Sequence, residues 1–277
     1  MLSSAYHDRT RSSQPLSTPN GNGALRIDVE QHDQGAVYRL TVDRPRRLNI
    51  LDSALLAGFA AALARIGDDD AARVAVLGGA GGKAWIGGAD IKEMAGLDAD
   101  TARDFIGRLH GLCAGLRALP VPVIARIDGF CLGAGVEVAA CCDMRVASTG
   151  SRFGMPEVLV GIPSVIEGAL LPRLIGAGRA RDLVLTGRVI DGEEALAWGL
   201  IESLVPADRL DAAVDERVSM ILSAGPRAIR DQKALCRQWE ELPLDAAVRA
   251  GIDAFGNAFL TDEPREYMQR FIDRPRK

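Results

Sequence analysis

Alternating hydrophobic and polar residues mark two short segments near the start of the folded part of the chain. Ala24 to Glu30 and Ala36 to Val42 alternate in this way, and the polar stretch QHDQG separates them. Because successive side chains of a strand point to opposite faces, this pattern predicts two strands joined as a hairpin. A helix is expected next, capped by Asp52 and ending at Gly67.

Short apolar runs then alternate with turns rich in glycine. Arg73 to Leu77, Ala84 to Ile86 and Val121 to Ile127 are predicted to be buried strands, and Gly133 to Cys142 a helix. Beyond these, helical spacing with polar faces is found over residues 207–222, 226–240, 244–258 and 262–273. We therefore predict an α/β core over residues 24–205 and a helical C-terminal region over residues 206–277.

Residues 1–23 are rich in Ser, Pro, Gly and Asn and have no apolar period, so we predict a disordered tail. The tail lacks the apolar region of a secretory signal. Its Arg and Ser content weakly resembles a mitochondrial transit peptide, although an ordinary natural tail is the favoured interpretation. We expect a cytoplasmic protein, with the mitochondrial matrix as the alternative.

Composition narrows the function classes. The chain has 277 residues, with 33 Lys and Arg against 37 Asp and Glu, and this charge balance disfavours binding to nucleic acid or to an anionic membrane surface. The longest mostly apolar stretch, Ser53 to Ala64, is shorter than the ~20 residues that a membrane-spanning helix needs. We therefore expect that stretch to be a buried helix.

The cysteine and histidine residues of the chain do not indicate a catalytic or metal-binding site. The five cysteines are odd in number, have no CxxC spacing and lie mostly among apolar residues, which favours reduced thiols over disulfides or a zinc site. The three histidines, His7, His32 and His110, lie in unrelated contexts, so we expect neither a histidine triad nor a metal site. A general base is then expected to be a carboxylate.

The glycine-rich segment Gly78 to Ala84 is a candidate for a phosphate-binding turn. A P-loop fails, because Leu77 and Ala84 stand where Gly and Ser or Thr are needed. A relaxed dinucleotide fingerprint does match at Gly79, Gly81 and Ala84, but no helix signal follows it. A plain loop is the favoured interpretation, and a dehydrogenase is the weakest alternative.

Three glutamates lie in unusually apolar surroundings: Glu137, Glu157 and Glu167. Burying an ionised carboxylate without a partner is costly, so such groups tend to have a raised pKa or to serve chemistry. For any one of them, a position on a helix surface is an equally good interpretation. Gly87, Gly88 and Ala89 permit close approach to a ligand, and the amide of Ala134 opens a predicted helix. Two such amides converging on one carbonyl oxygen would form an oxyanion hole, with tight turns as the alternative.

Four motifs occur in order: AWIGGADIKEM from Ala84, PVIARIDGFCLGAGVE ending at Glu137, CDMRVA from Cys142, and FGMPE ending at Glu157. In residues, order and spacing, they resemble the enoyl-CoA hydratase/isomerase family, also called crotonases. The resemblance extends from about Leu25 to the C-terminus. It implies an α/β fold, a spiral of ββα units followed by a helical trimerisation region, assembled as a homotrimer or a dimer of trimers.

The resemblance also implies a coenzyme A thioester as ligand. Ala89 and Ala134 match the two oxyanion-hole amides, and Glu137 and Glu157 match the catalytic glutamates of hydratases. We expect hydration of a 2-enoyl-CoA, in which Glu137 deprotonates the attacking water and protonated Glu157 delivers a proton to C2. The alternatives are isomerisation, decarboxylation or thioester hydrolysis of another acyl-CoA, or binding without catalysis. No cofactor or metal is implied, because coenzyme A enters as part of the substrate.

Other positions match the family less specifically. Asp90, Ile91 and Lys92 match a strip along the coenzyme A site, and Arg46 and Arg47 match the stretch near its nucleotide. Phe271 and Arg274 match C-terminal positions that can reach the ligand of a neighbouring subunit. Trp85, Phe105 and Leu132 are candidate walls of the pocket. For the charged residues, a solvated surface position is an equally good interpretation.

One segment departs from the family pattern. Where relatives carry a turn of the type IPGxGGTQRL, this chain reads GIPSVIEGALLPRLIG. The acyl end of the pocket is therefore expected to differ. Glu167 lies in this segment, either as a third polar group near the substrate or as a helix residue facing solvent, and the latter is favoured.

Overall fold

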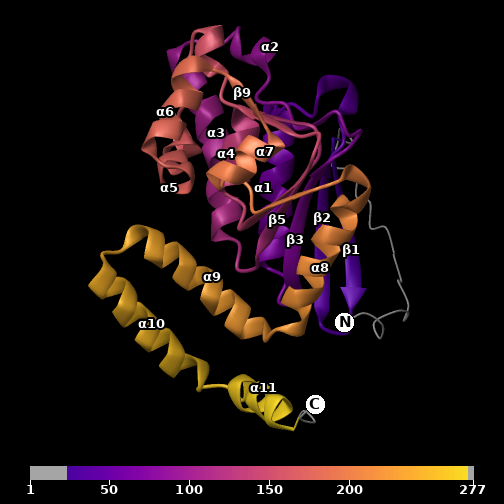
Figure 1. Ribbon diagram of the computed structural model, residues 1–277, viewed down its shortest axis with the longest axis vertical. Coiled ribbons are helices and arrows are strands. Elements are labelled where there is room, and N and C mark those ends of the chain that lie inside the picture. Colours follow the sequence, from indigo (N-terminus) through magenta and orange to yellow (C-terminus); the bar gives the residue numbers. More distant parts are fainter. Residues whose placement is uncertain (1–23, 274–277) are drawn as a thin grey trace.

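The computed structural model describes residues 24–273, and its strands form two sheets (Figure 1). The larger sheet has the strand order β1 (Leu25–His32), β2 (Gly35–Val42), β3 (Ala72–Gly79), β5 (Val123–Ile127), β7 (Met144–Ser148) and β10 (Ser203–Val205). The smaller sheet has the order β4 (Ala84–Ile86), β6 (Phe130–Leu132), β8 (Arg152–Gly154) and β9 (Val189–Asp191). All neighbours run parallel except the antiparallel pairs β1/β2 and β8/β9.

The chain crosses repeatedly from the larger sheet to the smaller one. Strand β3 leads to β4, β5 leads to β6, and β7 leads to β8, with helical segments between the successive pairs. This repeat is the predicted spiral of ββα units. Successive turns of the spiral therefore place the ends of β4, β6 and β8 next to one another.

Helices cover the sheets and form the C-terminal part of the described chain. The α-helices are α1 (Ser53–Gly67), α2 (Ile91–Met94), α3 (Ala99–Ala118), α4 (Ala134–Ala140), α5 (Leu171–Ile175), α6 (Ala177–Thr186), α7 (Gly192–Trp198), α8 (Leu210–Ser223), α9 (Pro226–Glu241), α10 (Leu244–Ala258) and α11 (Glu263–Ile272). Short 3-10 helices are η1 (Pro45–Arg47), η2 (Glu157–Val160), η3 (Ile166–Leu170) and η4 (Ala207–Arg209).

Local signals explain the first helix. The Asp52 side chain accepts a hydrogen bond of 2.9 Å from the backbone N–H of Leu55, which satisfies one of the free amides at the start of α1. The apolar face of α1, including Phe59 and Ile66, is buried in the main core. The predicted cap and the predicted buried helix are both confirmed.

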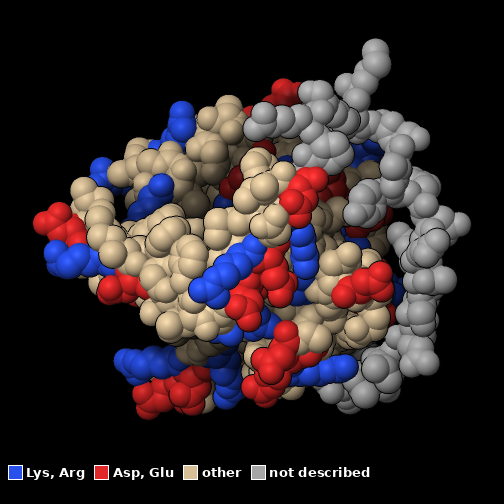
Figure 2. All heavy atoms as spheres, turned by 90° about the horizontal axis from the view of Figure 1, so that it is seen from below, with Lys and Arg blue, Asp and Glu red and all other residues tan. Residues whose placement is uncertain are grey.

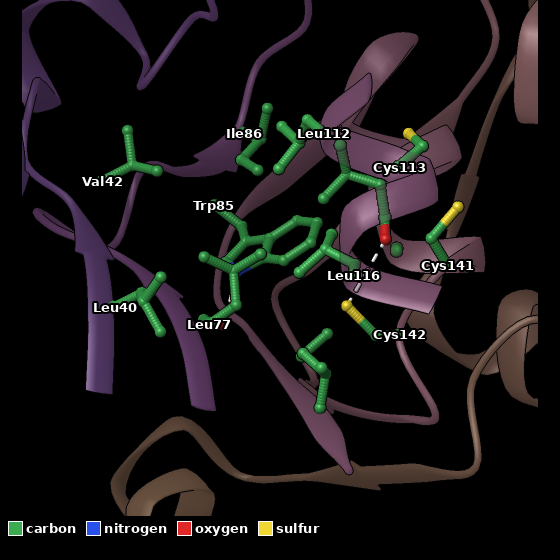
Figure 3. Packing of buried hydrophobic residues seen from close by; sticks show 14 of the residues in the cluster. Leu40, Val42, Leu77, Trp85, Ile86, Leu112, Cys113, Leu116, Cys141 and Cys142 are labelled. Atoms are coloured by element: carbon green, nitrogen blue, oxygen red, sulfur yellow. Dashed lines mark hydrogen bonds between the residues drawn. The ribbon is translucent and has the colours of Figure 1, made fainter. Parts of the chain in front are cut away.

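The core has two parts, one on each face of the larger sheet. Val74 and Val76 of β3 pack against α8, whereas Ala75 and Leu77 face the opposite way, into the main core. Trp85 is fully buried in this main core, among the apolar side chains shown in Figure 3. Its indole N–H donates to the backbone oxygen of Leu77 at 3.0 Å.

Strand ends differ from the predicted ones for identifiable reasons. The hairpin turn is tighter than QHDQG, because His32 pairs with Gly35 and only two residues separate the strands. Gly35 has φ +121°, which glycine adopts without a steric penalty. Strand β5 begins at Val123 rather than Val121, and Pro122 has no N–H to donate to a neighbouring strand.

The C-terminal helices lie close to their predicted positions, but the first of them belongs to the core. Helix α8 packs on the larger sheet, while α9, α10 and α11 extend away from it (Figure 1). The boundary at residues 205/206 stays a prediction, as does the tail over residues 1–23, which lies outside the described residues. None of the helices between residues 24 and 273 is long and apolar enough to cross a membrane.

Surface charge is mixed on the face shown in Figure 2, where acidic and basic side chains alternate over the described part of the chain. The five cysteines are free thiols, and all but Cys236 are buried. Within residues 24–273 there is no group of three or more His, Cys, Asp and Glu side chains that could hold a metal ion.

Candidate active site

The candidate site lies where three parallel strands of the smaller sheet end. Ile86 of β4 pairs with Cys131 of β6, and Cys131 also pairs with Phe153 of β8. The segment after each strand carries residues predicted from the sequence: Ala89 after β4, Ala134 and Glu137 after β6, and Glu157 after β8. The carboxyl ends of neighbouring parallel strands meet at one edge, so these segments are brought together.

Glycine allows the first two segments to approach closely. A Cβ atom added at Gly135 would lie 2.3 Å from the backbone oxygen of Ile86, so α4 could not pack against β4 with any other residue there. A Cβ atom at Gly88 would lie 3.3 Å from the backbone oxygen of Leu132. Within residues 24–273, neither the Ala89 nor the Ala134 amide donates a backbone hydrogen bond to another residue. Both amides are therefore available to a ligand.

Glu137 lies in α4 and is only 3% exposed. Its Oε1 accepts a hydrogen bond of 3.2 Å from the backbone N–H of Gly168. The pKa of Glu137 is raised to about 8, chiefly because the group is buried and also because Glu157 and Glu167 lie near it, while backbone hydrogen bonds from Gly168 and Val165 act in the opposite direction. At neutral pH this carboxyl group is therefore mostly protonated.

Glu157 is the first residue of η2 and is partly exposed. Its Oε2 accepts a hydrogen bond of 2.8 Å from the hydroxyl group of Ser164. A Cβ atom added at Gly133 would lie 2.4 Å from Oε1 of Glu157, so this carboxylate rests against the residue that precedes Ala134. The predicted acids and amides thus lie in one region of the molecule.

The preference for a solvent-facing Glu167 is wrong. Glu167 lies in η3, is 6% exposed, and contacts Nδ1 of His110 through Oε1 at 2.8 Å. The apolar residues around Glu167 in the sequence bury it, because η3 packs against both α3 and α4. Its charge raises the pKa of Glu137, so Glu167 lies near the two acids.

The residues predicted for the coenzyme A strip have different environments. Asp90 is 5% exposed; it caps α2 through the backbone N–H of Lys92 and forms an ion pair with Arg47 at 2.5 Å. Ile91 and Lys92, by contrast, are exposed, as is Arg46.

The predicted pocket walls are only partly supported. Trp85 and Phe105 are both buried in the main core, and their place as pocket walls stays a prediction. Leu132 is partly exposed beside the site. Phe271 is 71% exposed on α11, at the opposite end of the molecule from α2 (Figure 1), and Arg274 lies outside the described residues.

Three residues near the acids were not singled out as site residues by the sequence: Ser164, Gly168 and His110. Ser164 and Gly168 belong to the segment that departs from the family pattern, and that departure was the one available signal for them. Nothing near His110 in the sequence indicates a partner for its side chain. Its contact with Glu167 joins residues 57 positions apart.

Comparisons with known proteins agree on one family. The family model described as "Enoyl-CoA hydratase/isomerase" matches residues 32–277. A crotonyl-CoA hydratase from Syntrophomonas wolfei is 36% identical over 249 residues, covering 90% of this chain and 95% of the relative. A short-chain-enoyl-CoA hydratase from Clostridium acetobutylicum is 35% identical over 242 residues, covering 87% and 93%. Among solved structures, an enoyl-CoA hydratase from Bacillus anthracis matches with a TM-score of 0.86 and 33% identity, covering 90% of this chain and 96% of that one.

Proposed function

The chain belongs to the enoyl-CoA hydratase/isomerase family, and we propose that it adds water to a 2-enoyl-CoA thioester to give a 3-hydroxyacyl-CoA. The observation that carries this proposal is the meeting of two glutamates and two available amides at the ends of β4, β6 and β8. The similarity to two hydratases supports the same reaction. Coenzyme A enters as part of the substrate, and the reaction calls for no separate cofactor.

The thioester oxygen binds between the backbone N–H groups of Ala89 and Ala134. Attack at C3 moves negative charge onto this oxygen, so hydrogen bonds to it become stronger in the enolate than in the substrate. Interactions that strengthen along the reaction lower its barrier. Neither amide has to break a backbone hydrogen bond within the described chain to make this contact.

The two carboxyl groups carry the proton transfers. Glu137 takes a proton from the water that attacks C3, and Glu157 gives a proton to C2 as the enolate collapses. The raised pKa of Glu137 favours the opposite arrangement in the free protein, with the proton on Glu137. The proposed role of Glu137 as a base therefore requires it to lose this proton once the substrate is bound.

The test is the hydration of crotonyl-CoA, which is measured as the loss of the ultraviolet absorbance of its conjugated double bond. Glu137→Gln and Glu157→Gln should each lower kcat by about a hundredfold to ten-thousandfold and leave thioester binding nearly unchanged. Glu193→Gln, an exposed glutamate of α7, is the matched control and should retain full activity. Near-normal turnover in both site variants would refute the assignment. Binding of enoyl-CoA without turnover by the unaltered protein would instead indicate a non-catalytic homologue.

We also propose that the protein assembles as a homotrimer or a dimer of trimers. Helix α10 and its C-cap residue carry a row of exposed apolar side chains at helical spacing: Leu244, Val248, Ile252 and Phe255 in the helix, and Phe259 at the C-cap. Exposed apolar rows of this kind are typical of surfaces that are covered by another protein. A second copy of the chain is the proposed occupant, because α10 lies on the extended C-terminal part of every copy.

A further inference from the structure

One short segment contacts both proposed catalytic carboxyl groups. At its start, the Ser164 hydroxyl donates to Oε2 of Glu157 at 2.8 Å. At its end, the Gly168 backbone N–H donates to Oε1 of Glu137 at 3.2 Å. The position of residues 164–168 therefore decides where both carboxyl groups lie relative to each other.

The backbone of this segment is strained. Ile166 has φ +37°, in the left-handed region that a β-branched side chain rarely occupies. Such conformations cost about 1–3 kcal/mol and persist only where the surroundings hold them in place. Something outside the segment must therefore oppose its relaxation.

Glu167 supplies such a contact. Its Oε1 lies 2.8 Å from Nδ1 of His110, which projects from α3, so the pair ties η3 to a long helix of the core. The other oxygen, Oε2, is buried and has no hydrogen-bond partner within residues 24–273. A half-satisfied buried carboxyl group is costly for stability alone, which points to a role in the site beside it.

We propose that Glu167, tethered to His110, is a positioning residue that holds residues 164–168 across the carboxyl groups of Glu137 and Glu157. The tether fixes the residue next to Gly168, and so it fixes the amide that orients Glu137. Without it, the strained backbone at Ile166 relaxes and both hydrogen bonds to the acids are displaced. This inference rests on the proposed hydration reaction, whose rate depends on the geometry of the two acids.

The experiment separates the tether from the charge of Glu167. Glu167→Ala and His110→Ala both remove the contact, whereas Glu167→Gln keeps a side chain that can accept a hydrogen bond from Nδ1. With crotonyl-CoA, we expect Glu167→Ala to lower kcat by about tenfold to a hundredfold, with KM changed less than about threefold. Glu167→Gln should restore most of kcat. The double variant His110→Ala with Glu167→Ala should be no slower than Glu167→Ala alone, because both changes break one contact.

Asp104→Asn changes an exposed acid of α3, the helix that carries His110. It is the control and should behave as the unaltered protein. A kcat within twofold of the unaltered protein for Glu167→Ala, or additive losses in the double variant, would overturn the proposal. If Glu167→Ala does not fold, His110→Ala decides alone, since the His110 side chain is 57% exposed. An unaltered protein that fails to hydrate any enoyl-CoA would overturn the proposed function itself, which is a different result from an active protein insensitive to these changes.

Discussion

At the scale of single residues, the ionisation of Glu137 is governed by its surroundings. Its pKa is raised from 4.5 to about 8, chiefly by burial and also by two neighbouring carboxyl groups. Backbone hydrogen bonds from Gly168 and Val165 lower the pKa but do not reverse these effects. A group placed in this way is poised to exchange a proton near neutral pH, as acid–base catalysis requires.

The same shift predicts how stability depends on pH. Below pH 4.5 Glu137 is protonated in both the folded and the unfolded chain; between pH 4.5 and about 8 only the unfolded chain releases its proton. The free energy of unfolding should therefore fall as pH rises through this range, by at most about 1.4 kcal/mol per pH unit from this group. Glu137→Gln lacks this loss, so urea unfolding should show the variant gaining stability relative to the unaltered protein from pH 5 to pH 8. An equal difference at both pH values would contradict the shift.

At the scale of elements, the site depends on how closely α4 packs against β4. The strands and helices bring backbone groups together, and the missing side chain of Gly135 permits the contact. The amide of Ala134 and the carboxyl group of Glu137 both lie on α4. Any change in the distance between α4 and β4 therefore moves the Ala134 amide relative to the Ala89 amide, which follows β4.

Gly135→Ala should separate these elements. The added Cβ atom would lie 2.3 Å from the Ile86 oxygen, so we expect a loss of about 1–3 kcal/mol in stability together with a large loss of hydratase activity. Gly111→Ala in α3 is the matched control, because no atom outside the neighbouring part of its own helix lies within 4 Å of its Cβ position. It should gain about 0.5–1 kcal/mol from helix propensity and keep its activity. Thermal unfolding and a crotonyl-CoA assay check both variants, and equal behaviour of the two would refute the role of Gly135.

Much of this element-level organisation could be predicted from the sequence. The hairpin, α1 and the C-terminal helices follow from local periodicity and caps, which neighbouring residues determine. The buried position of Glu167 could not be predicted, because it depends on α3 and α4 closing over η3. The depth at which Trp85 is buried could not be predicted either, because it depends on how the main core packs around its ring. Contacts between distant segments, such as that of His110 with Glu167, leave no local pattern.

At the scale of the whole molecule, the C-terminal helices α9 to α11 contrast with the compact core (Figure 1). Phe255 of α10 and Phe259, the C-cap of that helix, contact each other with their ring centroids 5.3 Å apart, yet 71% of Phe255 and 38% of Phe259 remain exposed. Apolar side chains that remain in contact with water add little to the stability of a monomer. Coverage by another copy would remove this apolar surface from solvent and stabilise the assembly.

Phe255→Glu should therefore dissociate the assembly. A charge buried in an apolar interface without a partner is strongly unfavourable, so the variant should sediment as a smaller species than the unaltered protein. Met220→Glu, at a 60% exposed residue of α8, makes the same change away from α10 and should leave the mass unchanged. Analytical ultracentrifugation measures all three proteins. A monomeric unaltered protein, or an unchanged mass for Phe255→Glu, would refute the assembly through α10.

The crossing of the chain between two sheets has a consequence for biosynthesis. Each strand pair adds one fragment of the site, first Ala89, then Ala134 with Glu137, and last Glu157 with residues 164–168. A nascent chain on the ribosome that ends after β6 therefore still lacks Glu157 and residues 164–168. The proposed site is therefore divided along the gene, and neither half of a gene cut between β6 and β8 would encode all of its residues.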